Sequence, residues 1–328
     1  MINTLELVCP AGTPAALRTA VDNGADVVYL GFRDQTNARN FPGLNFSRPE
    51  LEQGIAYAHA RNCEIYLAIN TFPTAGNPEP WHLAVDDGAG LGVDAVILAD
   101  IGLLDYAAHK HPGLRLHLSV QAAASNPETI HFYQQAFNIK RVVLPRVLSV
   151  AEIAALNKEI SVETEVFVFG GLCVMAEGRC ALSSYVTGQS PNTNGVCSPA
   201  CAVRYEEDGD RMVSRLGDFT INAFEADEPA GYPTLCKGRF VARGTASYLF
   251  EDPVSLNAAS ILPELTAAGV TGLKIEGRQR GKAYIAEVVS SFRHAVDSLA
   301  DGMVEASDLT AIAEGQRKTS GAYDKTWR

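Results

Sequence analysis

Short apolar runs alternate with amphipathic segments along most of the chain. Eight of these runs have the length and residue types of buried strands, and the segments between them have the period of helices that pack on a sheet. The predicted strands cover residues 5–8, 26–31, 65–69, 94–99, 115–121, 141–146, 165–171 and 272–277. Helices are expected at about 14–23, 47–61, 82–90, 103–109, 126–137, 256–268 and 282–299, with a further one from 149. The alternation predicts an α/β fold, and the count of eight favours a (β/α)8-type barrel over an open doubly wound sheet.

Several helix starts are marked by capping residues. Ser47 with Glu50 and Ser149 with Glu152 have the spacing of a capping box, in which the two side chains satisfy each other's backbone N–H groups. Asn126, followed by Pro127, is likewise typical of a residue that caps the start of a helix. These signals fix where the helices of the barrel begin.

The chain has 328 residues, enough for one barrel with an insertion. We expect the barrel to comprise residues 1–170 and 251–305, with a cysteine-bearing, cluster-binding insertion at 171–250 after the seventh strand. Residues 306–328 would form a C-terminal tail.

Composition narrows the classes of function. With 47% hydrophobic and 20% charged residues, the chain is typical of a globular protein rather than a disordered one. It has no apolar run long enough to span a membrane and no secretory segment at its start, which favours a cytoplasmic protein. The net charge is −11 and no basic cluster stands out, so nucleic acid is not expected as a partner.

Four cysteines follow the seventh predicted strand in stretches rich in glycine and proline. They are Cys173, Cys180, Cys197 and Cys236, spaced C-x6-C-x16-C-x38-C. Four thiolates in such loops suit a [4Fe–4S] cluster or a zinc ion, and the lack of tight C-x2–4-C pairs among them favours iron–sulfur. A disulfide framework is disfavoured by the odd total of seven cysteines.

The other three cysteines are expected to have other roles. Cys9 and Cys63 lie beside predicted strands and are expected to be packed side chains. Cys201 lies four residues after Cys197, close enough to compete as a ligand.

Polar residues follow most of the predicted strands at their carboxyl ends, where a barrel builds its active site. An arginine held there is suited to binding a carboxylate through two hydrogen bonds. For each of these residues the alternative is a helix cap or a hydrogen bond that orders a loop. The candidates for substrate binding are Asn37, Arg39, Asn70, Gln121, Arg146, Glu276 and Arg278, with Asp100 and Lys274 beside them.

Familiar catalytic motifs are absent from the sequence. It contains no HExxH, no G-x-S-x-G, no P-loop and no GxGxxG after a strand. It also lacks the C-x3-C-x2-C triplet of radical S-adenosylmethionine enzymes. Neither a nucleophile–base pair nor a site for a metal-bound water can be assembled from these motifs.

The segment Glu165-x-Phe-x-Phe-Gly-Gly-Leu-Cys-x4-Gly-x-Cys-x2-Ser183 resembles the signature of the collagenase-like peptidase family. Further blocks extend the likeness over nearly the whole chain, among them residues 7–12, 36–46, 69–72, 97–100, 141–149, 190–193, 231–239 and 274–280. They are most similar to a branch of the family that hydroxylates the ubiquinone ring without O2.

The resemblance implies a [4Fe–4S] protein that works as a heterodimer with a second family member on a ubiquinone precursor. It also implies prephenate as the oxygen donor. Cys173, Cys180, Cys197 and Cys236 fall on the cluster positions of the family, whereas Cys201 departs from its pattern. The remaining alternatives are a peptidase and a non-catalytic iron–sulfur scaffold or electron carrier.

Overall fold

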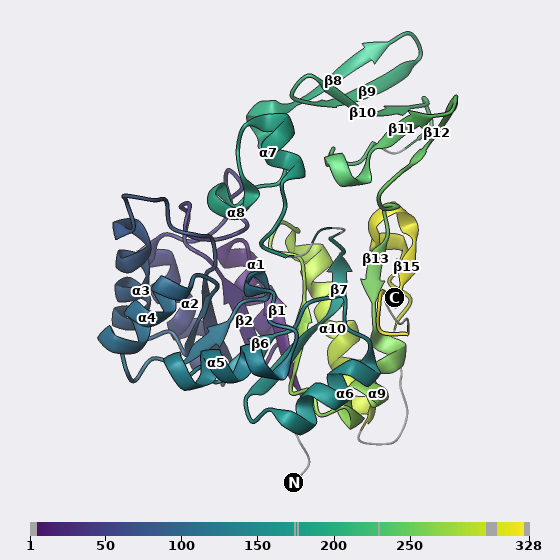
Figure 1. Ribbon diagram of the computed structural model, residues 1–328. Helices are drawn as coiled ribbons and strands as arrows, with labels where there is room; N and C mark the ends of the chain where they lie inside the picture. The colour runs from purple at the N-terminus through teal and green to yellow at the C-terminus, as the bar shows by residue number, and fades with distance from the viewer. Residues whose placement is uncertain (1–4, 174, 176, 229, 300–306, 325–328) are drawn as a thin grey trace.

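Eight parallel strands form a closed barrel in the computed structural model (Figure 1). The structure describes residues 5–173, 175, 177–228, 230–299 and 307–324. The seven strands that follow one another around the barrel are β1 (Glu6–Pro10), β2 (Val27–Leu30), β3 (Glu64–Ile69), β4 (Ala95–Leu98), β5 (Leu116–Leu118), β6 (Arg141–Val143) and β7 (Glu163–Gly171). The eighth, β14 (Gly272–Ile275), pairs with both β1 and β7 and so closes the ring. The predicted (β/α)8-type barrel is confirmed.

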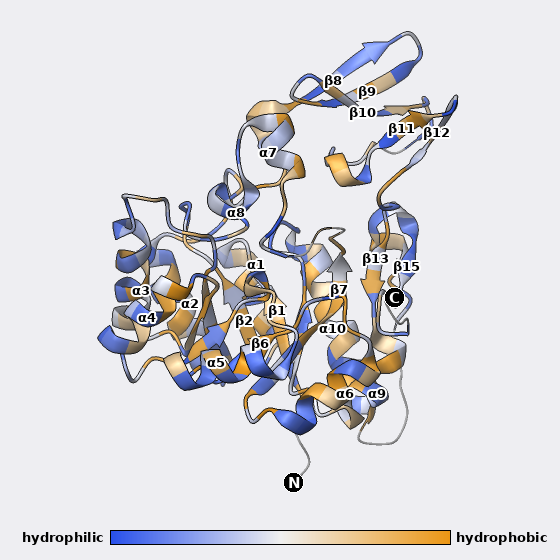
Figure 2. Ribbon diagram, viewed as in Figure 1, coloured by the Kyte–Doolittle hydropathy of each residue, from blue (hydrophilic) through white to orange (hydrophobic). Residues whose placement is uncertain are grey.

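The helices form the outer layer. They are α1 (Pro14–Asp22), α2 (Arg48–His59), α3 (Glu79–Leu91), α4 (Ile101–Lys110), α5 (Pro127–Phe137), α6 (Val150–Glu159), α9 (Leu262–Ala267) and α10 (Lys282–Ser298). Both predicted capping boxes are present, at Ser47 before α2 and at Ser149 before α6. The outer helices carry both blue and orange residues in Figure 2, as expected of helices with one face on the strands and one in solvent.

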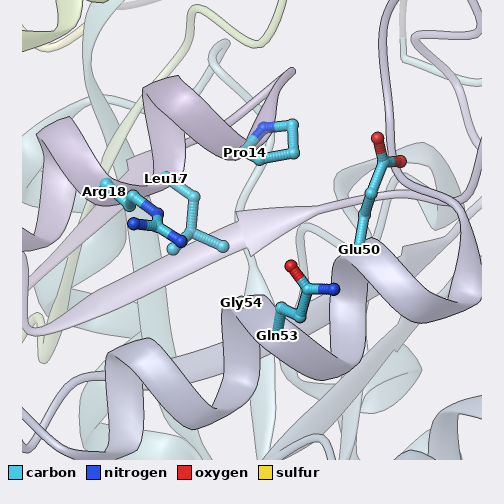
Figure 3. Close-up of a pocket in the computed structure, with 6 residues that line it drawn as sticks. All are labelled: Pro14, Leu17, Arg18, Glu50, Gln53 and Gly54. Carbon is cyan, nitrogen blue, oxygen red and sulfur yellow. The ribbon is translucent and has the colours of Figure 1, made fainter.

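The helices α1 and α2 show how closely this outer layer is packed. A Cβ at Gly54 on α2 would lie 2.8 Å from the Leu17 side chain of α1, so glycine is what permits this approach. A small surface pocket beside this contact is lined by Pro14, Arg18 and Glu50 among others (Figure 3). It lies on the outer helices, away from the cysteines, and we place no site in it.

The inside of the barrel has an apolar part and a charged part. Strands β1 to β4 contribute a buried apolar cluster made of Val8, Val27, Tyr29, Tyr66, Ala68, Ala95 and Ile97. Strands β6, β7 and β14 contribute Arg141, Glu165 and Lys274, all buried. Glu165 contacts both cations, at 2.6 Å from Lys274 Nζ and 3.3 Å from Arg141 Nη1. Charges in a barrel core are tolerated because they are paired in this way.

The region between β7 and the last barrel unit differs from the predicted pattern. Residues 256–268 were expected to be helical, but the chain first forms β13 (Ser255–Asn257), and α9 begins later. The predicted start of this helix is wrong, whereas the 3-10 helix Ala259–Ile261 and α9 confirm helical structure over most of the range. β13 pairs antiparallel with the end of β7, and a strand of three residues is too short to show an alternation in the sequence.

Between β7 and β13 the chain forms a separate group of small elements. It contains α7 (Leu182–Thr187), α8 (Pro191–Asn194), a three-stranded sheet of β8 (Val203–Asp208), β9 (Arg211–Leu216) and β10 (Phe219–Phe224), and a hairpin of β11 (Arg239–Ala242) and β12 (Thr245–Tyr248). Figure 1 shows this group standing beyond the end of the barrel at which β7 finishes. The limits of 171–250 for an insertion remain a prediction, since strand pairing does not define an independently folding unit.

The C-terminal segment packs against the same end of the barrel. Its strand β15 (Lys318–Thr319) pairs with β13, and Val150 donates its backbone N–H to Tyr323 O at 3.1 Å. Residues 306 and 325–328 of the predicted tail, like residues 1–4 and 300–305, lie outside the described residues. Within the described ranges, no helix is long and apolar enough to cross a membrane.

Candidate cysteine site at the barrel mouth

Four cysteines lie around the end of the barrel at which β7 finishes. Cys173 follows β7, Cys180 precedes α7, Cys197 follows α8, and Cys236 lies in a short 3-10 helix (Leu235–Lys237). Cys173 and Cys197 are exposed, and Cys180 and Cys236 are half-buried. Distant parts of the sequence therefore bring four accessible thiols to one region.

The four thiols interact electrostatically. The pKa of Cys236 is raised to about 11, mainly by burial and in smaller part by the nearby Cys173 and Cys197. Burial also raises the pKa values of the Cys173 and Cys197 thiols, and Cys180 adds to both shifts. Cys173 and Cys197 are thus exposed to solvent yet lie within enough surrounding protein for burial to be the largest cause of their pKa shifts. Thiolates that repel one another are stabilised when a cation or a metal cluster binds between them.

Two glycines allow the cysteine loops to lie directly on the barrel rim. Gly178, between Cys173 and Cys180, has φ +73°, and a Cβ there would lie 2.2 Å from the Gln121 carbonyl oxygen after β5. Gly195, before Cys197, has φ +78°, and a Cβ there would lie 2.3 Å from the Asn37 carbonyl oxygen after β2. Gln121 and Asn37, both candidate substrate residues, thus contact the cysteine loops.

Asn192 of α8 adds a further connection between the loops and the barrel. Its side chain donates to the Cys180 carbonyl oxygen at 3.2 Å, and its own carbonyl oxygen accepts from Phe72 N, after β3, at 3.0 Å. The Cys180 segment is thereby linked to the rim through a second loop.

Arg146, another candidate, is paired with the cysteine loop. Its Nη1 lies 2.8 Å from Glu177 Oε1, and both side chains are largely buried, at 10% and 9% exposed. The guanidinium also stacks on the Phe167 ring at 3.5 Å. Its Nε is buried and has no partner among the described residues.

The segment that carries Cys236 is held by the C-terminal tail. Lys237 Nζ lies 2.5 Å from Glu314 Oε2, and the Glu314 backbone N–H donates to Ser255 Oγ at 2.9 Å. Glu251 lies near this pair, and burial raises the pKa of its carboxyl group. The C-terminal tail therefore contacts the segment that carries Cys236.

Glu276 and Arg39 form a pair between the barrel rim and the cysteines. Arg39 Nε lies 3.4 Å from Glu276 Oε1, and Gly171 N donates to Glu276 Oε2 at 3.3 Å. Burial alone would raise the pKa of Glu276, but Arg39 and Arg146 outweigh it and hold that pKa below its usual value. Glu276 is therefore an anion at neutral pH. Arg39 also opposes the rise that burial causes in the pKa of the Cys197 thiol.

Arg278 is buried at the same rim. Its Nη2 donates to Asn37 Oδ1 at 2.9 Å, whereas its Nη1 has no partner among the described residues. A Cβ at Gly31 would lie 2.6 Å from that Nη1, so the absence of a side chain at Gly31 makes room for the guanidinium. Burial lowers the pKa of Arg278 to about 10, which still leaves it charged at neutral pH.

The remaining candidates have structural partners. Asn70 accepts from Ala38 N at 3.0 Å and so orders the loop after β2. Asp100 caps α4 by accepting from Leu103 N at 2.9 Å. Lys274 lies inside the barrel with Glu165. Asp100 thus makes the helix-cap contact that was its alternative, whereas the ion pair of Lys274 in the barrel core was not among the alternatives.

The other cysteines lie elsewhere. Cys9 and Cys63 are buried, as expected of packed side chains. Cys201 is exposed, and together with Cys197 it contributes to raising the pKa of Tyr232, after burial, which is the main cause.

The donor set fits an iron–sulfur cluster in its chemistry. The thiols are close enough to influence one another, and they lie in glycine-containing loops whose backbone can approach a cluster. Across the described ranges, no group of three or more Cys, His, Asp or Glu side chains is positioned to hold a metal ion. The four thiols would therefore have to move closer together to hold one cluster.

Sequence reasoning missed Glu177, Lys237 and Glu314. Each is a single charged residue in an irregular segment, and each partner is distant in sequence or in another loop. The position of Glu177 between two cysteines was the one available signal.

Comparison with known proteins identifies relatives over almost the whole chain. The family model for Peptidase family U32 matches residues 12–326. An uncharacterized protease of Methanocaldococcus jannaschii is 33% identical over 307 residues, covering 92% of this chain and 67% of the relative. The tRNA hydroxylation protein P of Escherichia coli is 33% identical over 329 residues, covering 94% and 72%. The 23S rRNA 5-hydroxycytidine C2501 synthase of Escherichia coli is 28% identical over 317 residues, covering 95% of this chain and 42% of the relative.

Proposed function

The chain belongs to peptidase family U32, and on that basis we propose that it takes part in a hydroxylation that does not use O2. The names of two relatives, a tRNA hydroxylation protein and a 5-hydroxycytidine synthase, support hydroxylation over peptide hydrolysis. The observation that carries the proposal is the position of four thiols at the barrel mouth, beside the charged pair Arg39 and Glu276.

We propose that Cys173, Cys180, Cys197 and Cys236 hold a [4Fe–4S] cluster. When bound, such a cluster supplies one-electron transfer, which a ring hydroxylation without O2 requires. The chain itself contributes four thiolates, loops that lie close to the rim, and Arg39 as a positive charge near Cys197.

The oxygen donor is proposed to be a small carboxylate, with prephenate as the candidate. Arg278 and Arg39 are the groups best placed to bind it, because Arg278 donates to the neutral Asn37 side chain rather than to a carboxylate and the Arg39 side chain is 39% exposed. Glu276 would orient Arg39 through their ion pair. Arg146 was expected to share this role, but its guanidinium is already paired with Glu177.

The acceptor is proposed to be a ubiquinone precursor. The sequence blocks described above resemble UbiU, and that resemblance implies a heterodimer with its paralogue UbiV in ubiquinone biosynthesis. The net charge of −11 supports this choice, because an RNA-binding surface would need clustered positive charge. RNA is the second candidate, since the hydroxylating relatives are named for tRNA and rRNA.

Two other functions make different predictions. A hydrolase would cleave peptides without iron, as the protease name of one relative suggests for that protein. A non-catalytic iron–sulfur scaffold or electron carrier would hold a cluster, and its arginine variants would leave product formation unchanged.

The first test is the iron and acid-labile sulfide content of protein purified without oxygen, for the wild type and for Cys180→Ala. We expect about four irons per chain and a broad absorption band near about 400 nm, both lost in the variant. Stoichiometric zinc without iron would refute the proposal, as would peptide cleavage by iron-free protein.

The second test separates binding of the donor from binding of the cluster. Arg278→Met, assayed with the UbiV-like partner, should abolish hydroxylation of the quinone precursor while iron content stays at the wild-type level. Arg280→Gln is the matched control, because Arg280 is exposed on the same segment. Unchanged product formation in Arg278→Met would remove Arg278 from the site, and modified RNA in place of quinone would reassign the acceptor.

A further inference from the structure

The loop from Cys173 to Cys180 is attached to the barrel at two adjacent residues. Glu177 pairs with Arg146, which follows β6, and Gly178 lies against the carbonyl oxygen of Gln121, which follows β5. Both residues lie between Cys173 and Cys180 in the sequence, so this attachment holds the loop at a point between the two cysteines.

We propose that Arg146 is a positioning residue, which holds Cys173 and Cys180 over the barrel mouth through its ion pair with Glu177. The inference rests on the proposed function in one respect, that these thiols are cluster ligands. It assigns Arg146 to the cysteine loop rather than to a substrate.

The surroundings of Arg146 make this ion pair stronger than one on the surface. Both side chains are about nine-tenths buried, and the pair lies at 2.8 Å, the distance of a charge-assisted hydrogen bond. Exposed pairs contribute little because water screens them, but removing one partner of a buried pair leaves the other charge uncompensated. This Arg146–Glu177 ion pair, which we call the latch, should therefore keep the loop from moving away from the barrel.

A contact with an aromatic ring of the barrel wall also fixes the position of the Arg146 side chain. Its guanidinium stacks on Phe167, a residue of β7, and β7 is the strand that leads directly to Cys173. The barrel wall, the arginine and the loop thus form one continuous set of contacts.

The same geometry argues against a substrate contact. A carboxylate ligand would bind a guanidinium best through two parallel hydrogen bonds. In Arg146 the Nη1 already donates to Glu177, whose negative charge would repel a second carboxylate at the same guanidinium. A carboxylate ligand would have to displace Glu177 to take its place.

Limited trypsin digestion of protein without its cluster tests the proposal directly. Arg179 is exposed and lies in the loop, so cleavage after it reports how often the loop opens. We expect Glu177→Gln and Arg146→Met to be cleaved there about tenfold to a hundredfold faster than the wild type. Cleavage after Arg211, at the exposed turn between β8 and β9, is the internal reference and should not change.

Two further variants distinguish a local latch from general loss of stability. Glu206→Gln removes an exposed ion pair with Arg215 on the neighbouring sheet, at 2.6 Å, and should behave as the wild type. Arg146→Lys, which can still reach Glu177 with one charge, should restore part of the protection at Arg179. In reconstituted protein, Glu177→Gln should lose iron to a chelator faster than Glu206→Gln does.

Wild-type cleavage rates after Arg179 in both Glu177→Gln and Arg146→Met would overturn the proposal. Equal acceleration after Arg179 and Arg211 would also overturn it, because the pair would then stabilise the whole chain rather than the loop. If the wild type never binds iron, the proposed function fails, while the cleavage rates still decide whether the latch exists.

Discussion

Replacing Glu165 with Gln tests how the barrel tolerates charge in its core. The substitution keeps the shape of the side chain but removes the carboxylate that lies 2.6 Å from Lys274 Nζ. Glu165 is fully buried and Lys274 is 6% exposed, so water cannot replace the lost partner. Lys274 keeps its contact with the Tyr29 ring at 3.7 Å, and Arg141 keeps Glu6 and Glu163.

The size of the effect follows from which groups are left unpaired. Breaking a buried ion pair by removing one partner costs about 3–5 kcal/mol of the free energy of unfolding, because the remaining charge stays buried. Arg141 has two other carboxylates, so most of the cost comes from Lys274. The exposed pair of Glu206 and Arg215 is the control, and Glu206→Gln should cost about 0–1 kcal/mol.

Denaturant unfolding of Glu165→Gln, Lys274→Met and the double variant measures this directly. The double variant should recover much of the loss, because no charge is then left alone in the core. Our reasoning would be refuted if Glu165→Gln were as mild as Glu206→Gln. Simple addition of the two single effects in the double variant would refute it as well.

The shifted pKa of Lys274 fixes the direction in which the free energy of unfolding changes with pH. Burial lowers the pKa of Lys274 below its usual value of 10.5, although Glu165 opposes the shift. Between the folded and unfolded pKa values the unfolded chain binds more protons, so stability rises with pH in that window. Without Glu165 the folded pKa falls further and the window widens. The stability deficit of Glu165→Gln should therefore shrink as the pH is raised.

Three further predictions concern the insertion and the outer layer. Gly195→Ala should destabilise the protein more than Gly188→Ala: positive φ costs alanine about 1–2 kcal/mol at both positions, and at Gly195 the new Cβ would also meet the Asn37 carbonyl oxygen, whereas nothing lies near a Cβ at Gly188. Equal melting temperatures of the two variants would contradict the close approach at Gly195. Glu314→Gln should speed alkylation of Cys236 in cluster-free protein by freeing Lys237, and an unchanged labelling rate would exclude a role for the tail. Ser47→Ala should cost about 0.5–2 kcal/mol in denaturant unfolding through loss of its capping box, and no change would contradict that cap.

The barrel could be predicted because its signals are local and repeated. Each strand is a continuous apolar run, and helix starts such as Ser47 and Ser149 carry their own capping chemistry. The error at residues 256–268 arose where β13, with three residues, pairs antiparallel with β7 and has no pattern of its own. The strands β8 and β12, between β7 and β13, are short and largely exposed, and no apolar alternation marked them.

For the candidate site, the sequence could show which residue types gather at the strand ends but not which of them contact each other. Arg146 and Arg278 had the same signal, an arginine after a strand. The structure separates them, because Arg146 is paired with the carboxylate of Glu177, whereas Arg278 donates to the neutral side chain of Asn37. Such pairing depends on loop paths that residue spacing does not determine.

The seam between β7 and β14 has a consequence for the order of folding. Glu165 pairs with Gly272, so the barrel closes through strands separated by the whole cysteine-bearing segment. Such a long-range contact forms late, because the chain must first lose the entropy of a large loop. During synthesis from the N-terminus, all four candidate ligands leave the ribosome before β14 does. We therefore expect the nascent chain to present these four thiols to solvent while the barrel is still open.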